Sequence, residues 1–152
     1  MNSKTNGFSL VELIIAVMFV AILAVIAVPR LNFSLTAEKD AQATAKKIAT
    51  DLRRTRQLAI SDAVNNTAGY RLRFNGSSPY SSYDIVNIDT SAVVDSHTIP
   101  SGVSCTTGSD FRFGPMGNLL GGSSSRIDVS GSGMSLTLTV TTATGMVKCV
   151  QN

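Results

Sequence analysis

The chain of 152 residues has one histidine, two cysteines and few charged residues, which make up 15% of it. The histidine, His97, lies with Asp95 and Ser96 in a predicted strand. Neighbouring residues on a strand point to opposite faces, so these three side chains are not expected to form a catalytic triad. The sequence also lacks paired carboxylates and a cluster of metal ligands. We therefore expect no enzymatic activity, no cofactor and no bound metal.

The scarcity of charge, together with abundant Ser, Thr and Gly, is typical of a β-rich surface outside the cytoplasm rather than of a cytosolic enzyme. The formal net charge of +3 is unevenly distributed. Residues 30–73 contain nine basic and four acidic residues, whereas residues 74–152 contain three basic and five acidic ones. The basic excess therefore belongs to one predicted helical stretch. It forms either a solvated helix face or a surface that binds anionic partners.

The two cysteines, Cys105 and Cys149, lack the short CxxC spacing of a redox or zinc site. A disulfide between them, in an exported domain, would stabilise the fold by ~3–4 kcal/mol. Two separate buried thiols are the alternative, because free cysteine is often a core residue.

The most informative segment is the apolar run Phe8–Val28, FSLVELIIAVMFVAILAVIAV. It is long enough for a membrane-spanning helix, which needs about 20 apolar residues. A plain signal anchor and a secretory peptide cleaved near Ala27 are alternatives. Glu12 interrupts the run, where an unpaired charge costs about 3 kcal/mol. The run contains no basic residue, so a partner for Glu12 must come from elsewhere.

The stretch Gly7-Phe8-Ser9-Leu10-Val11-Glu12-Leu13 closely resembles the class III signal of type IV pilins and type II secretion pseudopilins. The resemblance implies that residues 1–7 are a leader, cut after Gly7 by a prepilin peptidase that N-methylates Phe8. It also implies that Glu12 pairs with the N-terminal amine of a neighbouring subunit during assembly. Pro29 matches the position where the family's long helix bends. This agrees with the chemistry of proline, which lacks a backbone N–H donor and clashes with the preceding turn of a helix.

Beyond Pro29, residues 31–64 have helical periodicity, with an alanine-rich stripe formed by Ala41, Ala45, Ile48, Leu52, Thr55, Ala59 and Ala63. Alternation and turn signals after Gly69 then predict seven short strands: 70–74, 83–88, 92–99, 111–113, 126–129, 136–142 and 146–150. We expect an α+β pilin fold, in which a long N-terminal helix packs on antiparallel β-sheets. Its parts are a leader (1–7), a transmembrane and assembly helix (8–29), an amphipathic stem (30–66) and a β-rich globular domain (67–152).

Leu52–Ile60 and Phe111–Gly117 further resemble segments of the GspH/FimT-type minor pseudopilins. The resemblance implies a structural subunit of a type II secretion pseudopilus or a type IV pilus, in a protein secretion or pilus system. It places the chain in the bacterial inner membrane with a single pass, and its C-terminal domain in the periplasm or an extracellular filament. The implied partners are other pilin or pseudopilin subunits, the prepilin peptidase, the inner-membrane assembly platform and membrane lipid.

Three alternatives remain: a major pilin, an anchored binding module that never polymerises, and a minor pilin that binds DNA. Family members that take up DNA carry a Gly-Arg-x-Arg motif near the C-terminus. Here the corresponding stretch, Gly145–Lys148, has no arginine, which argues against DNA binding. The residues left for phosphate contacts are Arg53, Arg54 and Arg56, with Arg71 and Arg73.

Overall fold

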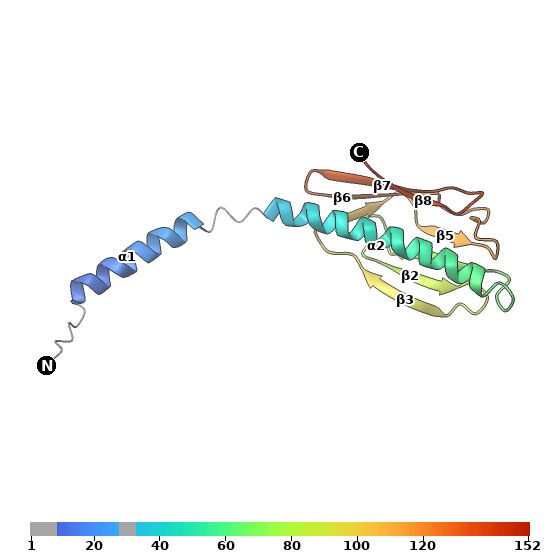
Figure 1. The fold of residues 1–152 in the computed structure, drawn as a ribbon, viewed down its shortest axis with the longest axis horizontal. Helices are drawn as coiled ribbons and strands as arrows, with labels where there is room; N and C mark the ends of the chain where they lie inside the picture. Colours follow the sequence, from blue (N-terminus) through green and yellow to red (C-terminus); the bar gives the residue numbers. More distant parts are fainter. Residues whose placement is uncertain (1–8, 28–32) are drawn as a thin grey trace, which may run out of the picture. The chain divides into compact units, whose positions relative to one another are not determined.

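The computed structural model describes residues 9–27 and 33–152 (Figure 1). It divides into two compact units, residues 1–33 and 34–152. The first unit contains helix α1 (Leu10–Ala27), and the second contains helix α2 (Phe33–Ser61) apart from its first residue. The β-strands also lie in the second unit, in two antiparallel sheets. The predicted α+β class with antiparallel sheets is therefore confirmed.

The predicted membrane span is wrong, and with it the predicted location as a single-pass protein of the bacterial inner membrane. Across residues 9–27 and 33–152, no helix has both the length and the apolar character required to cross a membrane. Helix α1 has 18 residues and carries Glu12 in its first turn. A bilayer crossing takes about 20 consecutive apolar residues, and a charge within them is costly.

Helix α2 packs the predicted alanine-rich stripe against the sheets. Six of the seven stripe residues are fully buried: Ala41, Ala45, Ile48, Leu52, Thr55 and Ala59. The seventh, Ala63, follows the helix and is half-buried. Small side chains along this face allow the helix backbone to lie close to the strands beneath it.

The turn after α2 is held by Asn66 and Gly69. The Asn66 side chain accepts a hydrogen bond from the Gly69 amide at 2.7 Å and donates one to the Gly69 carbonyl at 2.8 Å. Gly69 has a φ of +85°, and a Cβ there would lie 2.0 Å from the Phe113 carbonyl oxygen. Only glycine combines this conformation with so close an approach of two backbones. The turn thereby directs the chain from the helix into the first strand.

The first sheet has the strand order β3-β2-β1-β5. Its strands are β1 (Tyr70–Asn75), β2 (Ser82–Asn87), β3 (Val93–Thr98) and β5 (Asp110–Phe113). The second sheet has the order β4-β6-β7-β8. Its strands are β4 (Ser104–Thr106), β6 (Arg126–Gly131), β7 (Met134–Val140) and β8 (Val147–Gln151). All seven predicted strands are present, and the short β4 is the one that the sequence pattern did not predict.

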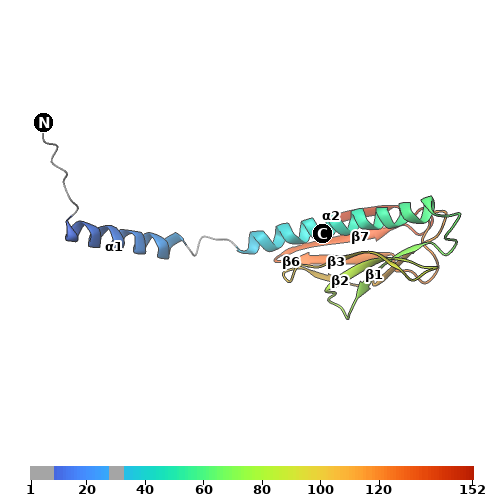
Figure 2. The same ribbon diagram turned by 90° about the horizontal axis from the view of Figure 1, so that it is seen from below.

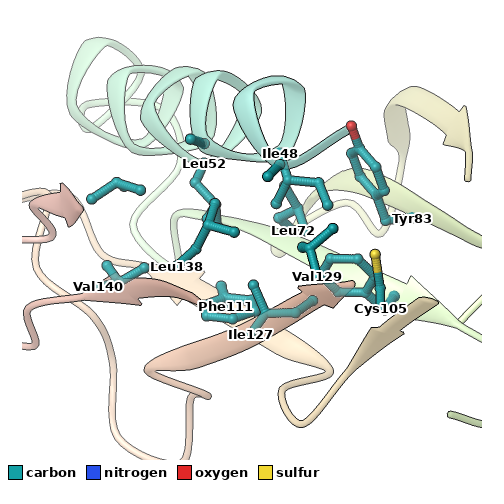
Figure 3. Packing of buried hydrophobic residues seen from close by; sticks show 14 of the residues in the cluster. Ile48, Leu52, Leu72, Tyr83, Cys105, Phe111, Ile127, Val129, Leu138 and Val140 are labelled. Carbon is teal, nitrogen blue, oxygen red and sulfur yellow. The ribbon is translucent and has the colours of Figure 1, made fainter. Parts of the chain in front are cut away.

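Helix α2 lies along both sheets and closes one core between the three layers (Figures 1 and 2). Figure 3 shows Ile48 and Leu52 pointing from α2 toward side chains of both sheets. Leu72 and Phe111 come from the first sheet, and Leu138 comes from the second. All five side chains are fully buried, so the globular unit has a complete core of its own.

Candidate functional site

Helix α1 presents apolar side chains on all sides. Eleven large apolar residues described on it are exposed, from Ile15 at 48% to Leu10 at 75%. The helix begins after Ser9, whose carbonyl accepts a hydrogen bond from the Leu13 amide at 3.1 Å. The surface of this helix therefore resembles the interior of a protein rather than its exterior.

Glu12 is the one charged residue of α1. It lies in the first turn, where a negative charge interacts favourably with the helix dipole. The small Ala16, one turn further on, leaves a shallow hollow lined by Glu12, Leu13, Ala16, Val17 and Val20. The carboxylate thus lies at one end of an apolar strip on one face of the helix.

Three other residues predicted for assembly lie outside the described residues. They are Gly7 and Phe8, at the predicted cleavage site, and Pro29, at the predicted bend. Their roles stay predictions.

The arginines of α2, predicted to face solvent or phosphates, contact the globular unit itself. Arg53 Nη2 donates to the Val147 carbonyl at 3.3 Å, and Arg56 Nε donates to the Gly117 carbonyl at 3.1 Å. Arg54 forms an ion pair with Asp95 on β3. The hydrogen bond from Arg54 holds the pKa of the Asp95 carboxyl below its usual range. Arg53 and Arg54 therefore attach α2 to the second and the first sheet, and Arg56 attaches it to the loop that contains Gly117.

The two arginines of β1 are also paired within the chain. An Arg71 nitrogen lies 4.0 Å from Asp110 Oδ2, and an Arg73 nitrogen lies 3.7 Å from Asp84 Oδ2. Each of the five arginines of the predicted phosphate-contact set thus has a carbonyl acceptor or an acidic partner in its own chain. This arrangement favours a structural role for them.

Asp51 is a site residue that the sequence analysis missed. It lies on α2, is 2% exposed, and accepts a hydrogen bond from the Tyr83 hydroxyl at 2.7 Å. Lys47 Nζ lies 3.2 Å from the same carboxylate oxygen, and His97 Nε2 lies 3.5 Å from it. Burial is the largest cause that raises the pKa of Tyr83, and the hydrogen bond to Asp51 and the charge of Asp51 raise it further. The sequence signal for the burial of Asp51 was its spacing: Asp51 follows the stripe residue Ile48 by three positions, which places it on nearly the same face of the helix.

His97 belongs to this polar cluster and not to a triad. Its Nε2 lies 3.4 Å from Asp95 Oδ2 and 3.3 Å from Lys47 Nζ. Ser96 points the other way and donates a hydrogen bond to Asp84 at 2.7 Å. Within the described residues, no group of three or more His, Cys, Asp or Glu side chains is placed to hold a metal ion.

The structure does not bring the two cysteines together. Cys105 lies on β4 and Cys149 on β8, the two outer strands of the second sheet, with β6 and β7 between them. Both are free thiols in the described part of the chain. Burial raises the pKa of the Cys105 thiol to about 12, so the reactive thiolate is scarce there. Cys149 is exposed.

Comparisons of the chain with protein-family models, curated proteins and solved structures found no match.

Proposed function

We propose that this chain is a structural subunit of the pilin and pseudopilin class, and that it assembles with similar subunits through helix α1. Two observations carry the proposal: the apolar surface of α1 is exposed, and the globular unit has a complete core of its own. Burying one leucine, isoleucine or phenylalanine side chain contributes ~1.5–3 kcal/mol. A helix with eleven exposed large apolar side chains therefore has a strong driving force to associate.

Similar helices of neighbouring subunits are the proposed cover for this surface. In such an assembly the carboxylate of Glu12 loses its contact with water, and a buried charge is costly unless it is paired. Because α1 contains no basic residue, a neighbouring subunit must supply the cation. The resemblance of the Gly7–Leu13 segment supplies one, the amine of a processed Phe8.

The resemblance also supports the processing steps of this proposal. A prepilin peptidase removes residues 1–7 and methylates Phe8, and the subunit then enters a type II secretion pseudopilus or a type IV pilus. The globular unit presents its surface to other subunits and to the assembly machinery. Its arrangement, a helix along two antiparallel sheets, is compatible with that role.

Substitution of Glu12 tests the assembly step. Glu12→Ala and Glu12→Gln both remove the charge, and the amide of the glutamine variant keeps the hydrogen-bonding capacity near the helix start. We expect both variants to be expressed and folded but depleted from sheared filaments by about tenfold or more, the loss that follows from about 1.4 kcal/mol of pairing energy. The measurement is the fraction of the chain that co-purifies with filaments when its assembly partners are present.

Glu38→Ala is the matched control, since Glu38 is the other glutamate of the chain and lies on α2. It should enter filaments at the wild-type level. Normal incorporation of both Glu12 variants would refute the pairing mechanism. The abundance of the wild-type chain in the same filaments distinguishes a minor from a major subunit.

A further inference from the structure

Strand β8 is an open edge of the second sheet. It pairs with β7 on one side only. The Asn152 amide donates to the Ser135 carbonyl at 3.0 Å, and the Thr141 amide donates to the Met146 carbonyl at 3.0 Å. Hydrogen-bonded pairs alternate along an antiparallel ladder, so Lys148 and Val150 also direct their backbone groups toward β7. The backbone groups of Val147, Cys149 and Gln151 therefore point outward.

The other three edges are protected. On β5, the Leu120 and Ser124 amides donate to the Arg112 and Asp110 carbonyls at 2.9 and 2.7 Å. The short β4 has its Cys105 carbonyl occupied by the Tyr80 amide at 3.1 Å. Strands with free backbone groups recruit further strands, and proteins usually cover or distort such edges.

Strand β3 is distorted rather than covered. Its pairing with β2 shifts register between Ile85 and Val86. The Ser96 amide is occupied by the Asp95 carboxylate at 3.0 Å. On β8, by contrast, the only outward backbone group with a partner among the described residues is the Val147 carbonyl, which Arg53 contacts. A carbonyl oxygen has a second lone pair, so this contact leaves room for another donor.

We propose that the β8 edge pairs with β8 of a second copy of this chain, antiparallel and in a register centred on Cys149. The proposal depends on the globular unit alone and not on the proposed function. In this register Cys149 faces Cys149 of the second copy, and Val147 faces Gln151. Each of these residues directs its amide and carbonyl outward, so each pair forms two backbone hydrogen bonds.

The side chains of β8 are complementary to themselves in this register. Lys148 faces Val150 of the second copy, so the two lysines do not lie opposite each other, where like charges destabilise a sheet. A register centred on Lys148 would place them opposite. The side chains of Lys148, Cys149, Val150 and Gln151 are all exposed, which leaves the edge accessible to another strand. This pattern favours a second β8 over an unrelated extended segment.

Cys149 provides a direct test, because hydrogen-bonded antiparallel partners have Cα atoms about 5.5 Å apart, within the ~4.4–6.8 Å that a disulfide spans. The full chain, purified with its thiols reduced in mild detergent, is oxidised briefly with copper–phenanthroline and analysed on a non-reducing gel. We expect a disulfide-linked dimer in wild type and in Cys105→Ser, and none in Cys149→Ser.

The register is tested by moving the thiol. Lys148→Cys, in the Cys149→Ser background, places the two cysteines on diagonal positions. Their Cα atoms are then ~7–8 Å apart, outside the Cα separation of ~4.4–6.8 Å that a disulfide spans. We expect its cross-linking rate to be about one tenth of the rate through Cys149, or lower. Equal rates at positions 148 and 149 would overturn the proposal, because random collisions of exposed thiols have no such preference.

Gln151→Pro tests the backbone pairing itself. It removes an outward amide and leaves the hydrogen bonds between β8 and β7 intact. We expect dimer cross-linking through Cys149 to fall about tenfold or more, since each copy loses one donor to the other. Thr98→Pro, on the β3 edge, is the control and should cross-link like wild type. An unchanged rate in Gln151→Pro would overturn the proposal.

Glu12→Ala separates this inference from the proposed function. It should leave the cross-linking through Cys149 unchanged, whatever its effect on filaments. A loss of cross-linking in Glu12→Ala would mean that α1, and not β8, brings the two thiols together.

Discussion

At the scale of single residues, Asp51 attaches helix α2 to the first sheet by a buried polar contact. Its carboxylate accepts a hydrogen bond from the Tyr83 hydroxyl at 2.7 Å, where the polar cluster with Lys47 and His97 meets the apolar core. The ring of Tyr83 is fully buried beside Ile48 and Leu72 (Figure 3). A buried donor that loses its partner cannot turn to water instead. Asp51 therefore specifies the rotation of α2 about its own axis as well as its distance from the sheet.

Asp51→Ala should lower the free energy of unfolding by about 1–3 kcal/mol, because it leaves the buried Tyr83 hydroxyl without an acceptor. The loss is measured by urea unfolding of the full chain in mild detergent, with near-ultraviolet circular dichroism as the signal. Asp40→Ala, on the same helix but only partly buried, is the control and should change stability by less than ~0.5 kcal/mol.

A double-mutant cycle with Tyr83→Phe isolates the contact. The double variant should be more stable than the sum of the two single losses indicates, with a coupling energy of ~0.5–3 kcal/mol. Strict additivity would contradict a direct Asp51–Tyr83 interaction.

Tyr83 also makes the stability of the globular unit depend on alkaline pH. Burial and the charge of Asp51 raise the pKa of Tyr83 in the folded state above the value of about 10 that holds for the unfolded chain. Its stabilising effect is complete below pH ~10 and is lost as pH rises toward the folded-state pKa, by up to ~1.4 kcal/mol per pH unit.

The measurement is the difference in unfolding free energy between wild type and Tyr83→Phe at several pH values. We expect the difference to be constant below pH ~10 and to fall above it. A constant difference across the alkaline range would show that Tyr83 ionises freely in the folded state.

At the scale of the elements, the sequence predicted best where one chemical signal repeats. The stripe of α2 repeats over Ala41–Ala59, and its burial followed as predicted. Strand β4 has only three residues, Ser104–Thr106, too few for alternation to appear. The membrane span was predicted from the length and apolar character of residues 8–28 despite the charge of Glu12, but the helix described there has only 18 residues.

The polar contacts of α2 were less predictable, because their partners are distant in the sequence. Asp51 and Tyr83 are 32 residues apart, and Arg53 and its acceptor Val147 are 94 apart. Periodicity placed the arginines off the apolar stripe, which was right, and suggested solvent as their surroundings. Only the strand order brings Asp95 and Val147 to the two flanks of the helix.

At the scale of the whole molecule, the two units differ in what they need. The globular unit buries its own apolar residues, whereas the described side chains of α1 are exposed along the helix. Large exposed apolar surfaces of this kind mark interaction sites. The proposed function assigns the role of partner to the same helix in neighbouring subunits. It also requires a free amine beside Glu12, which makes the start of the mature chain a decisive property.

The intact mass and the N-terminal sequence of the chain, purified from the cells that express it, test this requirement. We expect the mature chain to start at Phe8 and to carry one additional methyl group, because cleavage after Gly7 creates the amine that Glu12 needs. Substitution of Gly7 by leucine should leave the chain starting at Met1 and outside filaments. A wild-type chain that starts at Met1 would lack the amine at the right place, and one that starts at Val28 would lack α1 itself. Either result would rule out assembly through a Glu12–Phe8 pair, while the β8 pairing would remain to be judged by its own cross-link.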